Sequence, residues 1–304
     1  ARQARPGLTA MALLSLLDVA APAKLNLFLH VVGRRSDGYH LLQSVFVLID
    51  WADTLHFERR ADGQLRRHDL GAPLPADDLC LRAARLLQAE SGTSLGADIS
   101  IDKQVPWGAG MGGGSSDAAS TLLALNRLWN LDWPRPRLMA LGLTLGADVP
   151  FFIGGRNAFV EGIGEQLAPL PVPPTWLGVL KPAVAIETRA IFGSPLLVRD
   201  TDAVILAGFL ADTAGSVCRV LEGFGRNDLQ PPAEAHCADV TRALALMERC
   251  FGNARMTGSG SAVFARAGTG AVPTAAMPAD LPPGWVGRMC RSLEQHPLVG
   301  WASD

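Results

Sequence analysis

A glycine-dense loop is the feature that most constrains this sequence. Residues 106–119 read PWGAGMGGGSSDAA, with five glycines in the seven positions from Gly108 to Gly114. Glycine adopts backbone conformations that a Cβ disfavours, so such a loop can turn several N–H groups toward one point. Two serines then open a segment with apolar residues at helical spacing, and the N-terminus of a helix favours an anion. The pattern predicts a strand, a phosphate-binding loop and a helix in succession.

The loop does not match the commonest phosphate loops. It contains Gly108-x-Gly110-x-x-Gly113, but Pro106 and Trp107 separate these glycines from the preceding strand-like segment. No second strand ending in an acidic residue follows at the spacing of a dinucleotide-binding fold, which disfavours an NAD-dependent oxidoreductase. The loop has no Gly-Lys-Ser/Thr of a Walker A motif. The chain contains neither His-Arg-Asp nor Asp-Phe-Gly, so it is not a protein kinase of the usual type.

The rest of the chain alternates strand-like and helix-like segments. This alternation predicts a mixed α/β protein in two lobes, with a proline-rich linker at residues 170–174. Strands are expected at residues 23–32, 41–49, 54–59, 97–105, 157–161, 177–180, 254–256 and 262–265. Helices are expected at residues 79–90 after the capping pair Asp77-Asp78, at 115–129, 138–145 and 240–249, and one opening at 188–192.

Composition limits the functional classes. A chain of 304 residues favours two domains, and a formal net charge of −2 excludes bulk attraction to nucleic acid or to an acidic membrane surface. No apolar run approaches the roughly 18 residues of a spanning helix. The five cysteines are scattered without a Cys-x-x-Cys pair, which indicates thiols in a reducing compartment. We therefore expect a cytoplasmic protein without a nucleic-acid or membrane partner; as to oligomeric state, we expect a monomer or a weak homodimer.

The first residues resemble a secretory signal only superficially. Two arginines precede an apolar stretch, but Asp18 interrupts that stretch, and cleavage after Ala23 would cut into a strand-like run. We expect residues 1–10 to be a non-native or disordered extension before a natural start at Met11.

A small set of polar residues stands out from its apolar surroundings. Only three of the 27 basic residues are lysines, so each is a candidate for a role that arginine cannot fill. Lys24 and Asn26 are two apart in a strand and share a face. Asp148 lies between the glycine at 146 and an apolar segment, as a turn residue or as a catalytic carboxylate. A Lys/Asp pair beside a phosphate loop would be suited to phosphoryl transfer.

Three segments together resemble the motifs of the GHMP kinase superfamily. They are residues 21–27 (APAKLNL), the glycine loop 106–119, and residues 256–261 (MTGSGS). Four further segments resemble the superfamily members whose acceptor is a cytidine diphosphate derivative of methylerythritol, a precursor in non-mevalonate isoprenoid synthesis. These segments are 35–40 (RSDGYH), 145–150 (LGADVP), 161–165 (EGIGE) and 227–229 (NDL).

The resemblance implies a fold and an activity. The fold would comprise an N-terminal ATP-binding lobe of the ribosomal protein S5 domain 2 type at residues 11–170 and a ferredoxin-like C-terminal lobe at residues 171–304. The activity would be transfer of a phosphoryl group from ATP, with Mg²⁺, to the 2-hydroxyl of the cytidyl substrate. The residue that holds Mg²⁺ is left open, with Ser116 or a neighbour as the candidate.

The resemblance also assigns roles by position. Asp148 would be the catalytic base, Lys24 its charge partner, and Asn26 a contact to the methylerythritol part. Tyr39 and Phe192 would stack on the cytosine ring, His40 would bind its edge, and Thr188 would lie beside them. The ATP site would comprise Lys103, Pro106, Trp107, Gly108, Ala109, Gly110, Met111, Gly112, Gly113, Gly114, Ser115 and Ser116.

Departures and rivals remain. Asp78 stands where an asparagine near the adenine is usual, which leaves that contact open, because an ionised carboxylate only accepts hydrogen bonds. The rival functions are another GHMP kinase, acting on homoserine, mevalonate or a sugar, and a catalytically inactive nucleotide-binding regulator. Tyr39, His40 and Phe192 disfavour the former, because those acceptors carry no base to stack on. Lys24 and Asp148 disfavour the latter.

Overall fold

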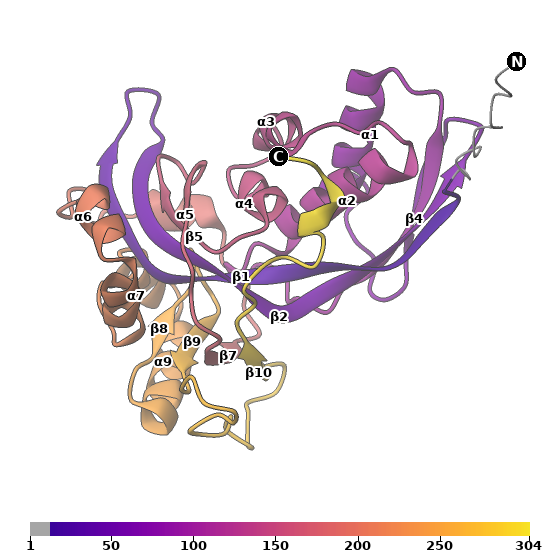
Figure 1. Ribbon diagram of the computed structural model, residues 1–304. Helices are drawn as coiled ribbons and strands as arrows, with labels where there is room; N and C mark the ends of the chain where they lie inside the picture. Colours follow the sequence, from indigo (N-terminus) through magenta and orange to yellow (C-terminus); the bar gives the residue numbers. More distant parts are fainter. Residues whose placement is uncertain (1–12) are drawn as a thin grey trace, which may run out of the picture.

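A long antiparallel hairpin runs through the whole molecule. The computed structural model describes residues 13–304, so the expectation for residues 1–10 lies outside the described residues. The hairpin consists of β1 (Ser15–Arg34) and β2 (His40–Arg60), which extend across both lobes in Figure 1. The first sheet has the order β3-β4-β2-β5-β6, with β1 paired to β2. Its other strands are β3 (Leu65–Asp69), β4 (Gly96–Asp102), β5 (Ala158–Glu161) and β6 (Gln166–Pro169).

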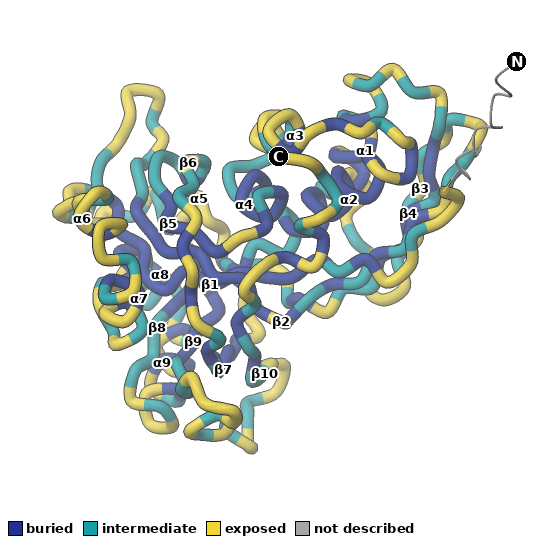
Figure 2. The backbone as a smooth tube through the Cα atoms, in the orientation of Figure 1, coloured by how far each residue is buried: buried dark blue, intermediate teal, exposed yellow. Residues whose placement is uncertain are grey.

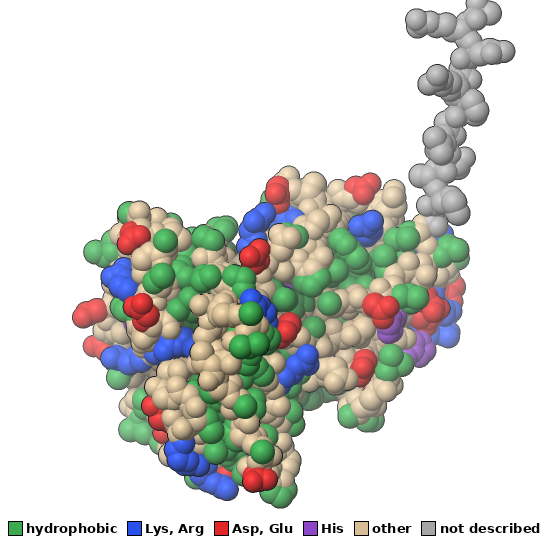
Figure 3. Space-filling view, turned by 60° about the horizontal axis from the view of Figure 1, so that its bottom comes forward, with side chains coloured by type: hydrophobic (Ala, Val, Ile, Leu, Met, Phe, Trp, Pro, Cys, Tyr) green, Lys and Arg blue, Asp and Glu red, His purple; other side chains and the backbone are tan. Residues whose placement is uncertain are grey.

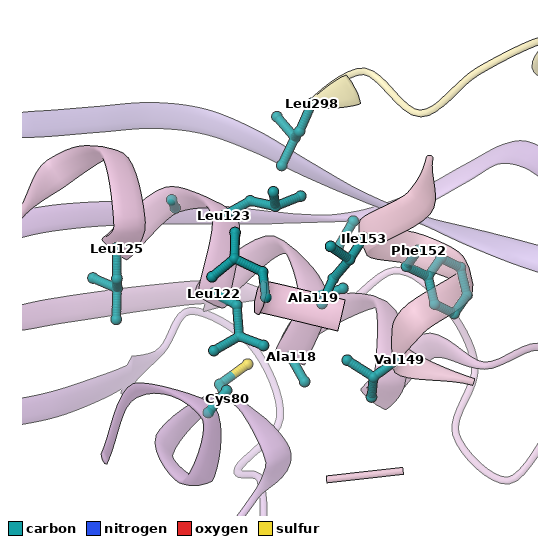
Figure 4. Packing of buried hydrophobic residues seen from close by; sticks show 14 of the residues in the cluster. Cys80, Ala118, Ala119, Leu122, Leu123, Leu125, Val149, Phe152, Ile153 and Leu298 are labelled. Carbon is teal, nitrogen blue, oxygen red and sulfur yellow. The ribbon is translucent and has the colours of Figure 1, made fainter. Parts of the chain in front are cut away.

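Four helices cover one face of this sheet and form the first core. Figure 4 shows apolar side chains of α2 directed toward residues of α1 and α4 and toward Leu298 near the chain end. Ala118, Ala119, Leu122 and Leu125 follow the three- and four-residue spacing expected for the buried face of α2, and all are fully buried. The helices are α1 (Leu79–Ser91), α2 (Gly113–Leu128), α3 (Arg135–Leu143) and α4 (Val149–Gly154).

The second lobe is built on a four-stranded sheet of order β10-β7-β9-β8. Its strands are β7 (Trp176–Lys181), β8 (Arg255–Met256), β9 (Val263–Arg266) and β10 (Val286–Arg291). Its helices are α5 (Thr188–Phe192), α6 (Leu206–Ala211), α7 (Thr213–Leu221), α8 (Gln230–His236) and α9 (Ala238–Phe251).

Strand β1 joins the cores of the two lobes. It is buried without interruption from Ala21 to Val31, as the dark central tube in Figure 2 shows. Its apolar residues take part in three separate hydrophobic clusters, one in the first lobe, one between the sheets and one under α9. A polar side chain in this stretch is therefore buried as well, and needs a hydrogen-bonding partner.

The structure corrects several predicted boundaries. The segments 41–49 and 54–59 form one strand, because Asp53 is fully buried and accepts hydrogen bonds from the N–H groups of Gln104 and Val105 instead of forming a turn. Helix α2 begins at Gly113, two residues before the serines, with Gly112 as its N-cap. Strands β3, β6 and β10 and helices α4, α6, α7 and α8 were not predicted. These elements are short, so they carry little periodic signal.

The C-terminal residues return to the first lobe. After β10 the chain crosses back and ends in a 3₁₀ turn, η1 (Val299–Trp301), beside α3 and α4 in Figure 1. The Arg135 guanidinium donates to the carbonyls of Ile153, Val299 and Ala302 and pairs with Asp304. The division of the chain at residue 170 stays a prediction, since β1 and β2 each contact more than one cluster and the tail packs on the cluster of the first lobe.

His296 makes the docking of this tail sensitive to acid. It is fully buried, its N–H donates to the Gly155 carbonyl, and its Nδ1 accepts from the Leu298 N–H. Burial, aided by the nearby Arg135 charge, lowers the pKa of His296 to about 3. The unfolded chain, with a histidine pKa of about 6.5, binds more protons than the folded protein between these values. Stability therefore falls as the pH drops below about 6.5.

We expect His296 to contribute a loss of about 2–3 kcal/mol in the free energy of unfolding between pH 6.5 and 4.5. Urea unfolding of the wild type and of His296→Gln at several pH values measures this slope, and the variant should lack the His296 share of it. His236→Gln, at an exposed histidine, is the matched control and should keep the wild-type slope. Equal slopes in all three proteins would refute the prediction.

The surface carries charges of both signs. On the face shown in Figure 3, Lys and Arg side chains alternate with Asp and Glu rather than gathering into one basic area, in line with the net charge of −2. Among residues 13–304, no helix combines the length and apolar character needed to cross a membrane.

Candidate functional site

One cavity of about 1150 Å³ gathers almost all of the predicted site residues. The glycine loop, β1, the start of α4, the β1–β2 turn and α5 all contribute to its wall. Of the residues predicted for catalysis, ATP binding and substrate binding, only Ser116 does not line it. The structure thus brings segments from both lobes to one place.

The glycine loop is held between β1 and the 256–261 loop. The Lys24 N–H donates to the Met111 carbonyl at 2.9 Å, and the Ala262 N–H donates to the Ala109 carbonyl at 3.1 Å. Gly110 has φ of +73°, and a Cβ there would lie 2.4 Å from the Thr257 carbonyl oxygen. Only glycine allows both this conformation and this close backbone approach.

The N-terminus of α2 opens into the cavity without a side-chain cap. Its N-cap, Gly112, adopts the left-handed conformation, and Gly113, Gly114 and Ser115 all line the cavity. The first N–H groups of a helix have no partners within the helix, so these three can donate to an external acceptor. Together with the helix dipole they form a site suited to phosphate.

The two serines after the loop point in different directions. Ser116 is fully buried, and its hydroxyl donates to the Pro22 carbonyl at 2.7 Å, which fastens α2 to β1. Ser115 lines the cavity. The structure therefore contradicts the expectation that Ser116 faces the nucleotide, because α2 starts two residues earlier than predicted and turns that side chain inward.

Lys24 and Asn26 share a face of β1, as predicted, and both are buried. The Lys24 ammonium donates to Asn26 Oδ1 at 2.7 Å and lies 4.4 Å from the centre of the Phe46 ring. The Asn26 amide donates to the Ser44 hydroxyl at 3.0 Å, and its Oδ1 also accepts from the Thr257 hydroxyl. This network holds the Lys24 side chain in one orientation at the cavity wall.

Asp148 completes an ion pair with Lys24 at 3.4 Å. Asp148 precedes α4, but its side chain makes no capping hydrogen bond, so the turn-residue interpretation does not account for it. It is 30% exposed and faces the cavity, whereas Lys24 is only 4% exposed. The turn at Gly164 packs against Asp148, where a Cβ on the glycine would lie 3.6 Å from Oδ1.

Lys103 lies between two buried carboxylates at the other side of the loop. Its ammonium pairs with Asp117 at 2.5 Å and with Asp53. Burial alone would lower the pKa of Lys103, but the Asp117 and Asp53 carboxylates outweigh it, so the pKa is raised and the side chain stays charged. Burial, with the Asp53 charge, raises the pKa of Asp117 well above its usual value. Neither aspartate was predicted, because the residues meet only through the packing of β2, β4 and α2.

Aromatic side chains form the far end of the cavity. Tyr39, on the β1–β2 turn, is 61% exposed and lines the cavity. His40 and Phe192 pack against each other with ring centres 4.9 Å apart and planes inclined by 30°. Thr188 opens α5 beside them, and its hydroxyl is 2.7 Å from that of Ser259. Tyr39, His40 and Phe192 thus present aromatic rings at this end of the cavity.

Asp78 does not line the cavity. Its carboxylate caps α1 by accepting from the Leu81 N–H at 3.1 Å and pairs with Arg67 at 2.8 Å. The predicted cap is therefore confirmed. The Asp78 carboxylate, whose contact with adenine was left open, is engaged in these two interactions. Arg199, which contacts His40, was not singled out in the sequence, since no motif contains it.

The arrangement combines three chemical capacities in one cavity. The α2 N-terminus and loop can hold phosphate, the Lys24–Asp148 pair can take a proton beside it, and the aromatic end can hold a planar ring. Residues of both lobes line the cavity between these three parts.

Comparison with known proteins agrees with this geometry. Residues 78–156 match the GHMP kinases N terminal domain and residues 205–276 match the GHMP kinases C terminal. The chain is 69% identical, over 96% of its length and 100% of the relative, to a 4-diphosphocytidyl-2-C-methyl-D-erythritol kinase of Methylibium petroleiphilum.

Solved structures extend the comparison. A crystal structure of 4-(cytidine 5'-diphospho)-2C-methyl-D-erythritol kinase is 35% identical, with a TM-score of 0.67 over 82% of this chain and 89% of that one. Homoserine kinase from Cytophaga hutchinsonii is 15% identical, with a TM-score of 0.63 over 88% of each chain, and shows the fold alone. The chain belongs to the GHMP kinase family, in the branch of the 4-diphosphocytidyl-2-C-methyl-D-erythritol kinases.

Proposed function

We propose that the protein transfers the γ-phosphoryl group of ATP to the 2-hydroxyl of 4-diphosphocytidyl-2-C-methyl-D-erythritol, a step of non-mevalonate isoprenoid synthesis. The observation that carries the proposal is the Lys24–Asp148 pair, 3.4 Å apart, in the same cavity as the N-terminus of α2 and the aromatic residues Tyr39, His40 and Phe192. The names of its relatives supply the identity of the acceptor.

Asp148 is the general base in this proposal. Its carboxylate takes the proton of the acceptor hydroxyl while that oxygen bonds to the γ-phosphorus, and the bond to the β,γ-bridging oxygen breaks to release ADP. Lys24, held by Asn26, places a positive charge beside Asp148 and the transferred group. Asn26 then acts chiefly by orienting Lys24, since its amide and carbonyl are already engaged with Ser44 and Thr257.

ATP binds with its phosphates at Gly113, Gly114 and Ser115 in this proposal, and Lys103 adds positive charge at the loop. Mg²⁺ usually takes most of its ligands from phosphates and water, with one or two protein oxygens. The residues fit such an ion, since Ser115 lines the cavity beside the helix N-terminus and its hydroxyl would supply one such oxygen. Among residues 13–304, no group of three or more His, Cys, Asp or Glu suited to metal binding occurs. When bound, the ion neutralises charge on the β- and γ-phosphates.

The cytosine ring occupies the slot between Tyr39 and the His40–Phe192 pair. Stacking a base on an aromatic side chain contributes about 1–3 kcal/mol. Tyr39→Ala should therefore raise KM for the cytidyl acceptor about tenfold or more and leave KM for ATP nearly unchanged. Steady-state kinetics with each substrate varied in turn measures both constants.

Tyr39→Phe is the matched control, because it keeps the ring and removes only the hydroxyl; it should retain near wild-type constants. If KM for ATP rose with that for the acceptor in Tyr39→Ala, Tyr39 would not be a wall of the base site.

The proposed function is tested by measuring ADP release from ATP–Mg²⁺ with each of four acceptors: the cytidyl substrate, homoserine, mevalonate and galactose. Turnover on the cytidyl compound alone is expected. Turnover on another acceptor would keep the phosphoryl-transfer site and refute the cytosine slot. ATP binding without turnover on any acceptor would favour the inactive regulator.

A further inference from the structure

Arg199 lies at the aromatic end of the cavity and contacts two residues of its wall, His40 and Phe192. Its Nε donates to His40 Nε2 at 3.0 Å, and one terminal nitrogen donates to the carbonyls of Phe192 at 2.9 Å and Ser194 at 3.1 Å. The other terminal nitrogen donates to the Leu197 carbonyl at 3.0 Å. Arg199 does not line the cavity itself, whereas His40 and Phe192 do.

The contact with Arg199 determines which ring nitrogen of His40 carries the proton. A guanidinium has five N–H donors and no acceptor, so His40 Nε2 can only accept from it. A neutral histidine that accepts at Nε2 must carry its proton at Nδ1. The His40 ring therefore offers its single N–H at Nδ1.

The surroundings also keep His40 neutral. Burial, together with the positive charges of Arg199 and Arg34, lowers the pKa of His40. Asp37, the acidic residue on the same turn, pairs with Arg35 at 2.7 Å and so is engaged elsewhere. A neutral ring with one defined donor presents a single hydrogen-bonding pattern to its neighbours.

We propose that Arg199 is a positioning residue for base binding, which fixes His40 in the Nδ1–H tautomer and holds its ring against Phe192 so that the slot is formed before the substrate arrives. The inference rests on the proposed function, since it concerns the cytosine end of the same cavity. Arg199 links the end of α5 to the first residue of β2, and the wall is otherwise contributed by segments far apart in the chain.

The tautomer can be tested in the wild-type protein without any variant. With ¹⁵N-labelled histidine, long-range ¹H–¹⁵N correlation spectra distinguish a protonated from an unprotonated ring nitrogen, and His40→Gln assigns the His40 signals among the six histidines. We expect Nε2 of His40 to be unprotonated and Nδ1 protonated at pH 7.5. A protonated Nε2 would overturn the proposal even if the enzyme were fully active.

Kinetics of Arg199 variants test the consequence. Arg199→Met keeps the aliphatic stem and removes every donor, so KM for the cytidyl acceptor should rise about tenfold, with kcat and KM for ATP within about twofold. Arg199→Lys retains a charged donor and should recover part of the loss. Arg242→Met, at an exposed arginine on α9, is the matched control and should behave as the wild type.

Several outcomes separate positioning from mere stabilisation. A lower melting temperature of Arg199→Met with unchanged constants for both substrates would overturn the proposal. So would equal changes in both KM values. If Arg199→Met does not fold, the kinetics of Arg199→Lys and the histidine spectra of the wild type still test the proposal. Binding of cytidine 5'-monophosphate, measured by calorimetry, tests the base site without turnover. Failure of the proposed kinase function would appear separately, as absence of activity in the wild type.

Discussion

Asp148→Asn should lower kcat by about 10²–10⁴, because an asparagine cannot take the proton of the acceptor hydroxyl and general bases contribute about this much. The substitution keeps the size of the side chain. The Asp148 carboxylate caps no helix and is 30% exposed, so its loss should not disturb the fold. Lys24 would keep its hydrogen bond to Asn26. The defect should therefore appear in the chemical step and not in ATP binding.

Three measurements test this account. Single-turnover rates with saturating substrates report the chemical step, titration with ATP reports binding, and thermal unfolding reports the fold. A variant whose rate stays within tenfold of the wild type would remove Asp148 from the role of base. Asp239→Asn, at a surface aspartate paired with Arg242, is a suitable control and should show the wild-type rate.

The parts of this site that are local in sequence could be predicted from sequence. The glycine loop, the helix that follows it and the shared face of Lys24 and Asn26 all depend on spacing within a dozen residues. The Asp78 cap of α1 belongs to the same class. Motif resemblance then linked segments as distant as residues 24 and 148, which periodicity alone cannot connect.

Features that depend on packing between distant elements were missed. Ser115 and Ser116 differ by one helical position, and the start of α2 at Gly113 decides which of them faces the cavity. Asp53 lay in the gap between two predicted strands and Asp117 in the predicted helix 115–129, and neither was expected to contact Lys103, as both do. Arg199 reaches His40 across 159 positions of the chain. Such contacts leave no periodic pattern in the sequence, so the three-dimensional structure is needed to find them.

Lys103→Met should destabilise the protein by about 3–5 kcal/mol, because removing one member of a buried ion cluster leaves its partners uncompensated. Asp53 is fully buried and Asp117 nearly so, and Lys103 is the cation that both carboxylates contact. Asp53 also accepts hydrogen bonds from the Gln104 and Val105 N–H groups, so it cannot turn away toward solvent. Urea unfolding at pH 7 measures the loss.

The same substitution should make stability depend more strongly on pH. Burial and the Asp53 charge already raise the pKa of Asp117, and loss of the ammonium raises it further above its unfolded value of about 3.9. A folded-state pKa above the unfolded one means that the folded protein binds more protons, and stability falls as the pH rises through that range. The loss caused by Lys103→Met should therefore be greater at pH 7.5 than at pH 5.

Two further variants distinguish this cause from a simple packing defect. Lys103→Met combined with Asp117→Asn removes one of the two buried carboxyl groups, and should recover part of the stability and flatten the pH dependence. Lys181→Met is the matched control, since Lys181 is also buried but donates only to the Pro182 and Val184 carbonyls. Its removal leaves no carboxylate without a partner. It should show no added pH dependence between pH 5 and 7.5. If Lys103→Met lost less than about 1 kcal/mol, or if the double variant were no more stable than the single one, the two aspartates would not depend on Lys103 for their burial.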